Sequence, residues 1–220
     1  MLPYDAIVPI HGIHDDGSEG VDRLARAVSR LTDIPVREPS LPRRWAIGCY
    51  FESKNRADAL EVNKHLDGRT ILITHSRGGL VADRVMKMRK HPTELVSKCF
   101  MFSPALPADI LPGNGNFNHL WVVHNQHDKA LLSSRLLPWH PFTGGRWFAV
   151  MRKSLGRVGY IGEDAPNITN MDGSTDDSFL DHSNYWLGPT RTEFWAEWIV
   201  DQLYRDIGMC SCGKDLQNGK

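Results

Sequence analysis

One short segment restricts the folds open to this chain more than any other. The apolar run at 70–74 is followed directly by the sequence His75-Ser76-Arg77-Gly78-Gly79. Apolar residues at helical spacing begin at Leu80, so a strand, a tight turn and a helix are predicted in immediate succession. Such a turn lifts the Ser76 hydroxyl out of the edge of a sheet, with the N-terminus of the next helix beneath it.

Strands and helices alternate along the rest of the chain. Short apolar strands are predicted at 5–10, 70–74, 98–102 and 120–123, and amphipathic helices at 21–31, 55–66, 80–88 and 190–207. Residues 34–36 and 45–50 fit either a strand or a loop. Thr190 and Glu193 have the spacing of a capping box at the start of the last helix. The alternation predicts an α/β fold with a mostly parallel central sheet and helices on both faces.

The length of 220 residues suits one α/β domain, and no change of composition divides the chain. We expect a single domain over 1–208 and a flexible C-terminal tail at 209–220. The segment at about 132–163 is irregular and rich in aromatic residues, which predicts a short cap or lid. Its aromatic side chains suit either the core of that cap or the lining of an acyl-binding groove.

Charge and hydropathy restrict the partners of the chain. The 26 basic and 26 acidic residues cancel, so no net field attracts nucleic acid or anionic lipid. No apolar stretch approaches the roughly 18 residues of a membrane-spanning helix, and residues 1–5 do not resemble the start of a secretory signal. We therefore expect a cytoplasmic protein that acts on a small molecule; the sequence leaves its oligomeric state open.

Metal and cofactor sites are not predicted. Cys49 and Cys99 lie in apolar surroundings and are expected to be buried, and Cys210 and Cys212 lack a second pair at zinc spacing. The histidine and aspartate groups near His11 and near His124 match no standard metal site. The glycines between 156 and 162 do not have the dinucleotide-binding spacing.

Four short motifs occur in order along the chain, each after a predicted strand or before the last helix. They are Pro9-Ile10-His11-Gly12, Thr74-His75-Ser76-Arg77-Gly78-Gly79, Asn125-Gln126-His127-Asp128 and Asp181-His182-Ser183. Taken together, the motifs make the chain resemble the α/β-hydrolase family, in particular its small esterase- and lipase-like members. The resemblance extends from residue 5 to about residue 203 and implies the α/β-hydrolase fold.

The resemblance also implies roles for particular residues. Ser76 would be the nucleophile of a nucleophile elbow, His182 the general base and Asp128 the acid that orients the imidazole. Asp109 is a rival for the acid, because some lipase-like relatives carry this carboxylate after the preceding strand. A serine hydroxyl is a weak nucleophile by itself, so the chemistry requires both partners.

Further residues are expected around this centre. The backbone N–H of Arg77, together with that of Ile13 or Gly12, would form the oxyanion hole. The side chain of Arg77 either reaches a substrate anion or faces solvent, and we expect it to face solvent. His11 is expected to pack and form a hydrogen bond beneath the oxyanion loop, and His75 is expected to point along the turn as a structural residue. The candidate substrate-contacting residues are His11, Trp139, Phe142 and Trp147.

The predicted activity is the hydrolysis of carboxylic esters through an acyl-serine intermediate, with no cofactor. A thioesterase or deacylase would use the same three residues, and the same chemistry would also allow a peptidase or amidase. A non-catalytic binding protein on the hydrolase fold is a third hypothesis, because Thr74 stands where the family usually has a small residue. In such a protein the Ser76 hydroxyl and the His182 ring would lie beyond hydrogen-bond reach.

Overall fold

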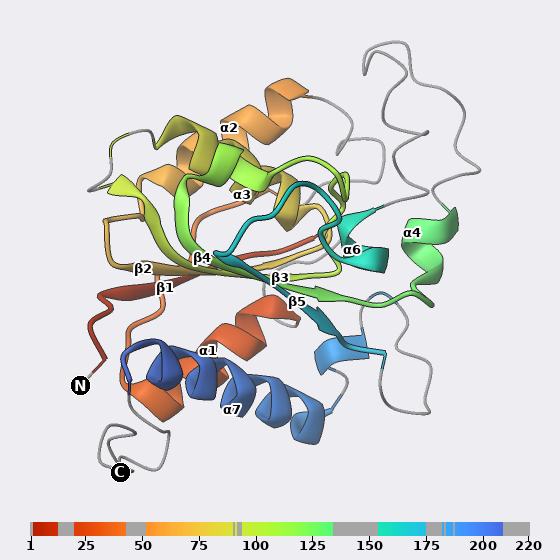
Figure 1. Ribbon diagram of the computed structural model, residues 1–220. Helices are drawn as coiled ribbons and strands as arrows, with labels where there is room; N and C mark the ends of the chain where they lie inside the picture. Colours follow the sequence, from red (N-terminus) through yellow and green to blue (C-terminus); the bar gives the residue numbers. More distant parts are fainter. Residues whose placement is uncertain are drawn as a thin grey trace.

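The computed structural model describes residues 2–12, 20–42, 52–89, 91, 94–133, 154–174, 182, 184–186 and 188–208. One parallel sheet forms its centre, and its five strands are hydrogen-bonded in chain order (Figure 1). They are β1 (Ala6–Ile10), β2 (Thr70–His75), β3 (Val96–Phe102), β4 (Phe117–His124) and β5 (Ile168–Asp172). Val36 adds an isolated parallel bridge to Ile7, which extends the sheet beyond β1.

Helices cover both faces of the sheet (Figure 1). On one face lie α1 (Val21–Thr32) and α7 (Pro189–Asp206), and on the other lie α2 (Glu52–Asn63) and α3 (Gly78–Met88). The shorter helices are η3 (Pro112–Gly115), α4 (Lys129–Ser133), α6 (Leu155–Val158) and η7 (Asn184–Trp186). The α/β architecture with a parallel sheet, predicted from the alternation of elements, is confirmed.

The central strands are buried on both sides, which explains their continuous apolar runs. Successive side chains of a strand point to opposite faces. Ile71 and Ile73 of β2 accordingly pack in the core under α1 and α7, whereas Leu72 packs in the core under α2 and α3. His75 has the same parity as Ile71 and Ile73, so its side chain belongs to the α1–α7 face.

The element boundaries differ from the predictions by a few residues, and one local prediction is wrong. The last helix has Gly188 as its N-cap, with a φ of 80° and no side-chain cap hydrogen bond. Thr190 therefore lies inside the first turn and does not form a capping box with Glu193. In α2 the helix begins at Glu52, three residues before the expected start at Asn55.

Some predicted segments lie outside the described residues. These are the strand or loop at 45–50, the tail at 209–220 and most of the proposed cap at 132–163. Within the part of the chain that the structure describes, no helix is long and apolar enough to cross a membrane.

Candidate active site

Ser76 occupies the turn between β2 and α3. Its φ is 54°, a left-handed conformation that is rare for a residue with a side chain. Hydrogen bonds hold this backbone in place: the Ser76 N–H donates to the Phe102 carbonyl at 3.0 Å, and its carbonyl accepts from Gly79 and Ala105, both at 3.0 Å. Strain at one residue persists only where its surroundings fix it, and active sites are where such strain gathers.

Two glycines allow the chain to pass close to this turn. A Cβ atom on Gly78 would lie 2.1 Å from the Ile10 carbonyl oxygen, so only glycine lets α3 begin here. A Cβ on Gly12 would lie 3.1 Å from the Ser76 Cβ, which places the segment after β1 directly against the serine. The side chain of Thr74 is fully buried beside this turn, but its hydroxyl has no hydrogen-bond partner.

Three side chains from distant parts of the sequence meet at this turn. The Ser76 Oγ lies 2.6 Å from Nε2 of His182, and Nδ1 of the same ring lies 2.6 Å from Oδ2 of Asp128. A buried carboxylate accepts hydrogen bonds, so Nδ1 carries the proton and Nε2 is left to accept the serine proton. The structure therefore brings together all three residues that the sequence suggested as nucleophile, base and acid.

Asp128 is held by its own turn after β4. Its side chain is 0% exposed, its Oδ1 accepts the Leu131 N–H at 2.8 Å, and its own N–H donates to the Asn125 carbonyl at 3.0 Å. Asp109, the rival acid, is exposed in the segment after β3. His182 donates its Nδ1 hydrogen bond to Asp128 and not to Asp109, which makes Asp128 the better candidate for the acid.

Arg77 differs from its expected placement. Its side chain is 1% exposed and forms an ion pair with Asp58 of α2, which is 2% exposed, so the prediction of a solvent-facing arginine is wrong. Two of its guanidinium nitrogens, Nε and Nη1, are buried without a hydrogen-bond partner. Asp58 was not identified from the sequence, because a carboxylate in the middle of a helix looks like part of a solvated face.

The other predicted site residues divide into two groups. Gly12 lies against Ser76, and His11 is buried beside it, with Nδ1 donating to the Gly12 carbonyl at 3.2 Å. The remaining candidates, Ile13, Trp139, Phe142 and Trp147, lie outside the described residues.

His75 is buried beneath the turn and touches the candidate base. Its Nε2 lies 2.8 Å from the His182 carbonyl oxygen, and the two ring centroids are 4.7 Å apart. Burial, and secondly the positive charge that His182 can carry, lower the pKa of His75 well below its ordinary value. His75 therefore remains neutral near neutral pH.

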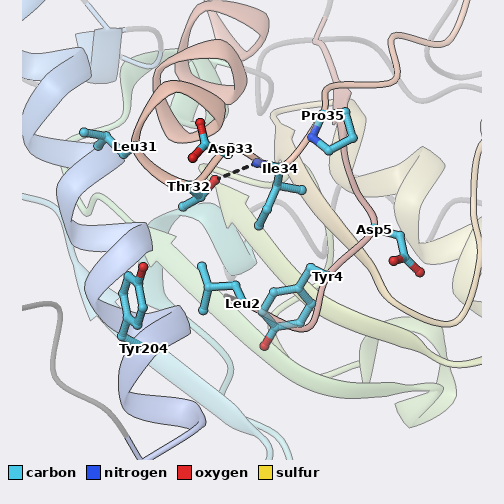
Figure 2. A pocket seen from close by; sticks show the side chains of 9 residues that line it. All are labelled: Leu2, Tyr4, Asp5, Leu31, Thr32, Asp33, Ile34, Pro35 and Tyr204. Atoms are coloured by element: carbon cyan, nitrogen blue, oxygen red, sulfur yellow. Dashed lines mark hydrogen bonds between the residues drawn. The ribbon is translucent and has the colours of Figure 1, made fainter. Parts of the chain in front are cut away.

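An open pocket of about 490 Å³ lies at the other end of the sheet (Figure 2). The residues that line it precede β1, end or follow α1, or belong to α7: Leu2, Tyr4, Asp5, Leu31, Thr32, Asp33, Ile34, Pro35 and Tyr204. Ser76 follows the carboxyl end of β2, so this pocket does not serve the three side chains described above. Within the described ranges, no three His, Cys, Asp or Glu residues group closely enough to hold a metal ion.

No protein-family model matches the chain, and no curated protein matches it. Several solved structures resemble it. A carboxylesterase from Mesorhizobium loti is 15% identical, with a TM-score of 0.47 over 89% of this chain and 88% of that one. An extracellular α/β-hydrolase from a Paenibacillus species is 16% identical, with a TM-score of 0.45 over 90% and 98%. A thioesterase of prodiginine biosynthesis from Streptomyces coelicolor is 17% identical, with a TM-score of 0.40 over 89% and 85%.

Proposed function

We propose that the chain is a serine hydrolase with the α/β-hydrolase fold and that it cleaves carboxylic esters. One observation carries the proposal: a continuous hydrogen-bonded relay runs from the Ser76 hydroxyl through His182 to the buried Asp128, with both links at 2.6 Å. Proton transfer between two groups requires that they lie within hydrogen-bond distance. The three residues meet this requirement although they are far apart in the sequence.

In the first half of the reaction, Ser76 Oγ attacks the carbonyl carbon of the ester while Nε2 of His182 takes the hydroxyl proton. The new C–O bond leaves negative charge on the former carbonyl oxygen. As the bond to the leaving alcohol breaks, His182 returns its proton to the alcohol oxygen. Asp128 holds the ring and stabilises the imidazolium that forms between these steps.

In the second half, a water molecule attacks the acyl-serine and His182 takes a proton from that water. The acyl–Oγ bond then breaks, the carboxylic acid leaves and the proton returns to Ser76. In both halves the oxyanion would be met by the backbone N–H of Arg77 and by one from Gly12 or Ile13. Each such donor typically lowers the barrier by about 3 kcal/mol.

Substrate contacts are assigned to His11 and to the aromatic residues Trp139, Phe142 and Trp147. His11 is supported by its burial next to Gly12, on the segment that lies against the serine. We expect the substrate to be a small-molecule ester or other acyl compound. The mechanism requires no metal or organic cofactor, since each proton and each bond is handled by the three side chains.

The experiment combines a fluorophosphonate probe with the hydrolysis of p-nitrophenyl acetate and butyrate. We expect the wild-type chain to be labelled and to hydrolyse these esters, and Ser76→Ala to lose both properties. Ser53→Ala, on the exposed side of α2, is the matched control and should behave as wild type. Absence of labelling in the wild type, or labelling that survives Ser76→Ala, would reject the proposal.

A thioesterase or deacylase remains the second candidate, since the same relay would serve it. Oxygen and sulfur esters of matched chain length separate the two, and a strong preference for thioesters would replace the ester assignment. The non-catalytic hypothesis expected Ser76 and His182 to lie beyond hydrogen-bond reach. Their separation of 2.6 Å favours an enzyme instead.

A further inference from the structure

His75 ends β2 and directly precedes Ser76, yet the proposed reaction does not use its side chain. The residue is only 5% exposed and lies on the α1–α7 face of the sheet. A buried histidine next to a nucleophile is costly to desolvate, so its polar atoms need partners. The Nε2 atom of His75 forms its hydrogen bond with the backbone carbonyl of His182, the candidate base.

The hydrogen bond between the two histidines can have only one direction, from His75 to His182. A carbonyl oxygen accepts and cannot donate, so the 2.8 Å contact from Nε2 of His75 to the His182 carbonyl requires a proton on that nitrogen. A neutral imidazole holds one proton, so Nδ1 of His75 is unprotonated. The contact joins residues that are 107 positions apart.

His182 itself lies in a turn and in neither a helix nor a strand, so the hydrogen bond from His75 adds to what holds its backbone. It lies between β5 and the short η7, while its ring must remain within 2.6 Å of two partners. The ring is held by Ser76 and Asp128, but the backbone from which the ring extends is held by His75. A displacement of about 1 Å at a reacting group costs on the order of 10²-fold in rate.

Packing around His75 strengthens the same connection. The Trp186 ring of η7 meets the His75 ring edge-on, with centroids 4.7 Å apart. Its neighbour Tyr185 is fully buried and shares a 2.7 Å hydrogen bond between its hydroxyl and that of Ser103, at the end of β3. Two strand ends therefore hold the segment that contains His182. A Cβ on Gly12 would lie 3.2 Å from Nδ1 of His75, so the segment after β1 packs on the same ring.

We propose that His75 is a positioning residue for the hydrolytic reaction: by donating from Nε2 to the His182 carbonyl, it fixes the backbone of the catalytic base relative to the nucleophile. This inference rests on the proposed function, because it assigns His75 a task in that reaction. The hydrogen bond of His75 goes to the backbone of His182 and not to an atom that reacts. Its neutral ring also suits the neighbourhood of a base that becomes cationic during each half of the reaction, since a second positive charge 4.7 Å away would oppose that step.

Two substitutions separate the hydrogen bond from the packing. His75→Phe retains a flat ring of similar size but has no donor, whereas His75→Gln retains an N–H donor at nearly the same distance from the backbone. We expect His75→Phe to lower kcat for p-nitrophenyl acetate by about 10²-fold with little change in KM. His75→Gln should recover at least about tenfold of that loss. The control is His65→Phe. His65 follows α2 and pairs with Glu61 of that helix, so this variant should behave as wild type.

The outcomes distinguish this inference from the function on which it rests. A wild-type chain that neither hydrolyses esters nor reacts with a fluorophosphonate overturns the proposed function. An active wild type with an equally active His75→Phe variant overturns only the positioning role. Equal losses in the Phe and Gln variants overturn it as well, because the donor would then not matter.

The ring itself can be observed directly by ¹⁵N NMR of the imidazole nitrogens. We expect His75 to show a protonated Nε2 and an unprotonated Nδ1 throughout the range in which an ordinary histidine titrates, around pH 6.5. A merely structural role without the hydrogen bond would not select this tautomer. An Nδ1–H tautomer, or protonation of the ring within that range, would contradict the inference.

Discussion

Ser76 has a φ of 54° because the chain turns from β2 into α3 within two residues. A residue in that conformation is held there by its surroundings, here by hydrogen bonds to Phe102, Gly79 and Ala105. The Ser76 hydroxyl is thereby held within hydrogen-bond distance of the His182 ring. At the scale of single residues, the candidate site is a set of rigidly placed atoms from segments that follow β2, β4 and β5.

Replacing Asp128 with asparagine tests the role of the buried acid. The amide can donate to Nδ1 of His182 and so favour the wrong tautomer, which leaves Nε2 protonated and unable to accept from Ser76. We expect kcat for ester hydrolysis to fall by about 10⁴-fold while the fold is retained. Asp109→Asn is the matched control, since that carboxylate is exposed, and it should retain full activity. If instead Asp109→Asn were the inactive variant, the acid would be misassigned.

A second residue-scale prediction concerns the buried hydroxyl of Thr74, which lacks a hydrogen-bond partner. Thr74→Val replaces it with a methyl group of the same shape, so the desolvation cost of the hydroxyl disappears. The free energy of unfolding should rise by about 1 kcal/mol, measured by urea denaturation. Thr74→Ser keeps the hydroxyl, removes the methyl group and should lower it. A loss of stability in Thr74→Val would show that the hydroxyl has a partner in solution.

The convergence of Ser76, Asp128 and His182 could be predicted, because each belongs to a recognisable motif after a strand or before the last helix. The side chain of Arg77 could not be predicted, because its direction depends on Asp58 in a different helix. The contact of His75 with His182 was missed for a related reason. Strand parity predicts the face on which His75 lies, but no local pattern predicts which loop will cover that face.

At the scale of elements, the predicted strands and helices that have strong apolar patterns are present. The elements that were not predicted have weak patterns: η3, α4, α6 and η7 are at most five residues long, and β5 is largely exposed at the edge of the sheet. Polar residues are common on edge strands, where they discourage pairing with other chains. The error at Thr190 has another cause, since Gly188 takes the N-cap position through its backbone alone.

The ion pair between Asp58 of α2 and Arg77, at the start of α3, can be tested by a double-mutant cycle. Arg77→Met alone leaves the Asp58 carboxylate buried without its guanidinium partner, and we expect a loss of about 3–5 kcal/mol in the free energy of unfolding. Arg77→Met combined with Asp58→Asn removes both charges, so the double variant should lose less than the sum of the single variants. Urea denaturation of the four proteins measures the coupling. Additive losses would mean that the two charges do not depend on each other.

At the scale of the whole molecule, histidines link stability to pH. Burial lowers the pKa of His75 well below 6.5, and it also lowers the pKa values of His119 and His124. In the unfolded chain these residues bind protons near pH 6.5, whereas in the folded chain they resist protonation. The unfolded state therefore binds more protons as the pH falls below about 6.5, and folding becomes less favourable.

We therefore expect full stability from this source above pH 6.5 and a progressive loss on acidification. One histidine contributes a slope of at most about 1.4 kcal/mol per pH unit. Urea denaturation at a series of pH values should show the decline, and His75→Gln should make it shallower. A stability that stays constant between pH 7 and about pH 5 would contradict the burial of a neutral His75.

The wide separation of the relay residues along the chain has a consequence for how activity appears during refolding. Ser76 and His182 are 106 positions apart, and Asp128 and His182 are 54 apart. Contacts between distant residues form only after long loops have closed, and parallel sheets are slow to assemble. Turnover should thus be among the last properties that a renatured chain recovers, behind its helical circular dichroism, because the relay is complete only when the segment before α7 has docked on the ends of β2 and β3.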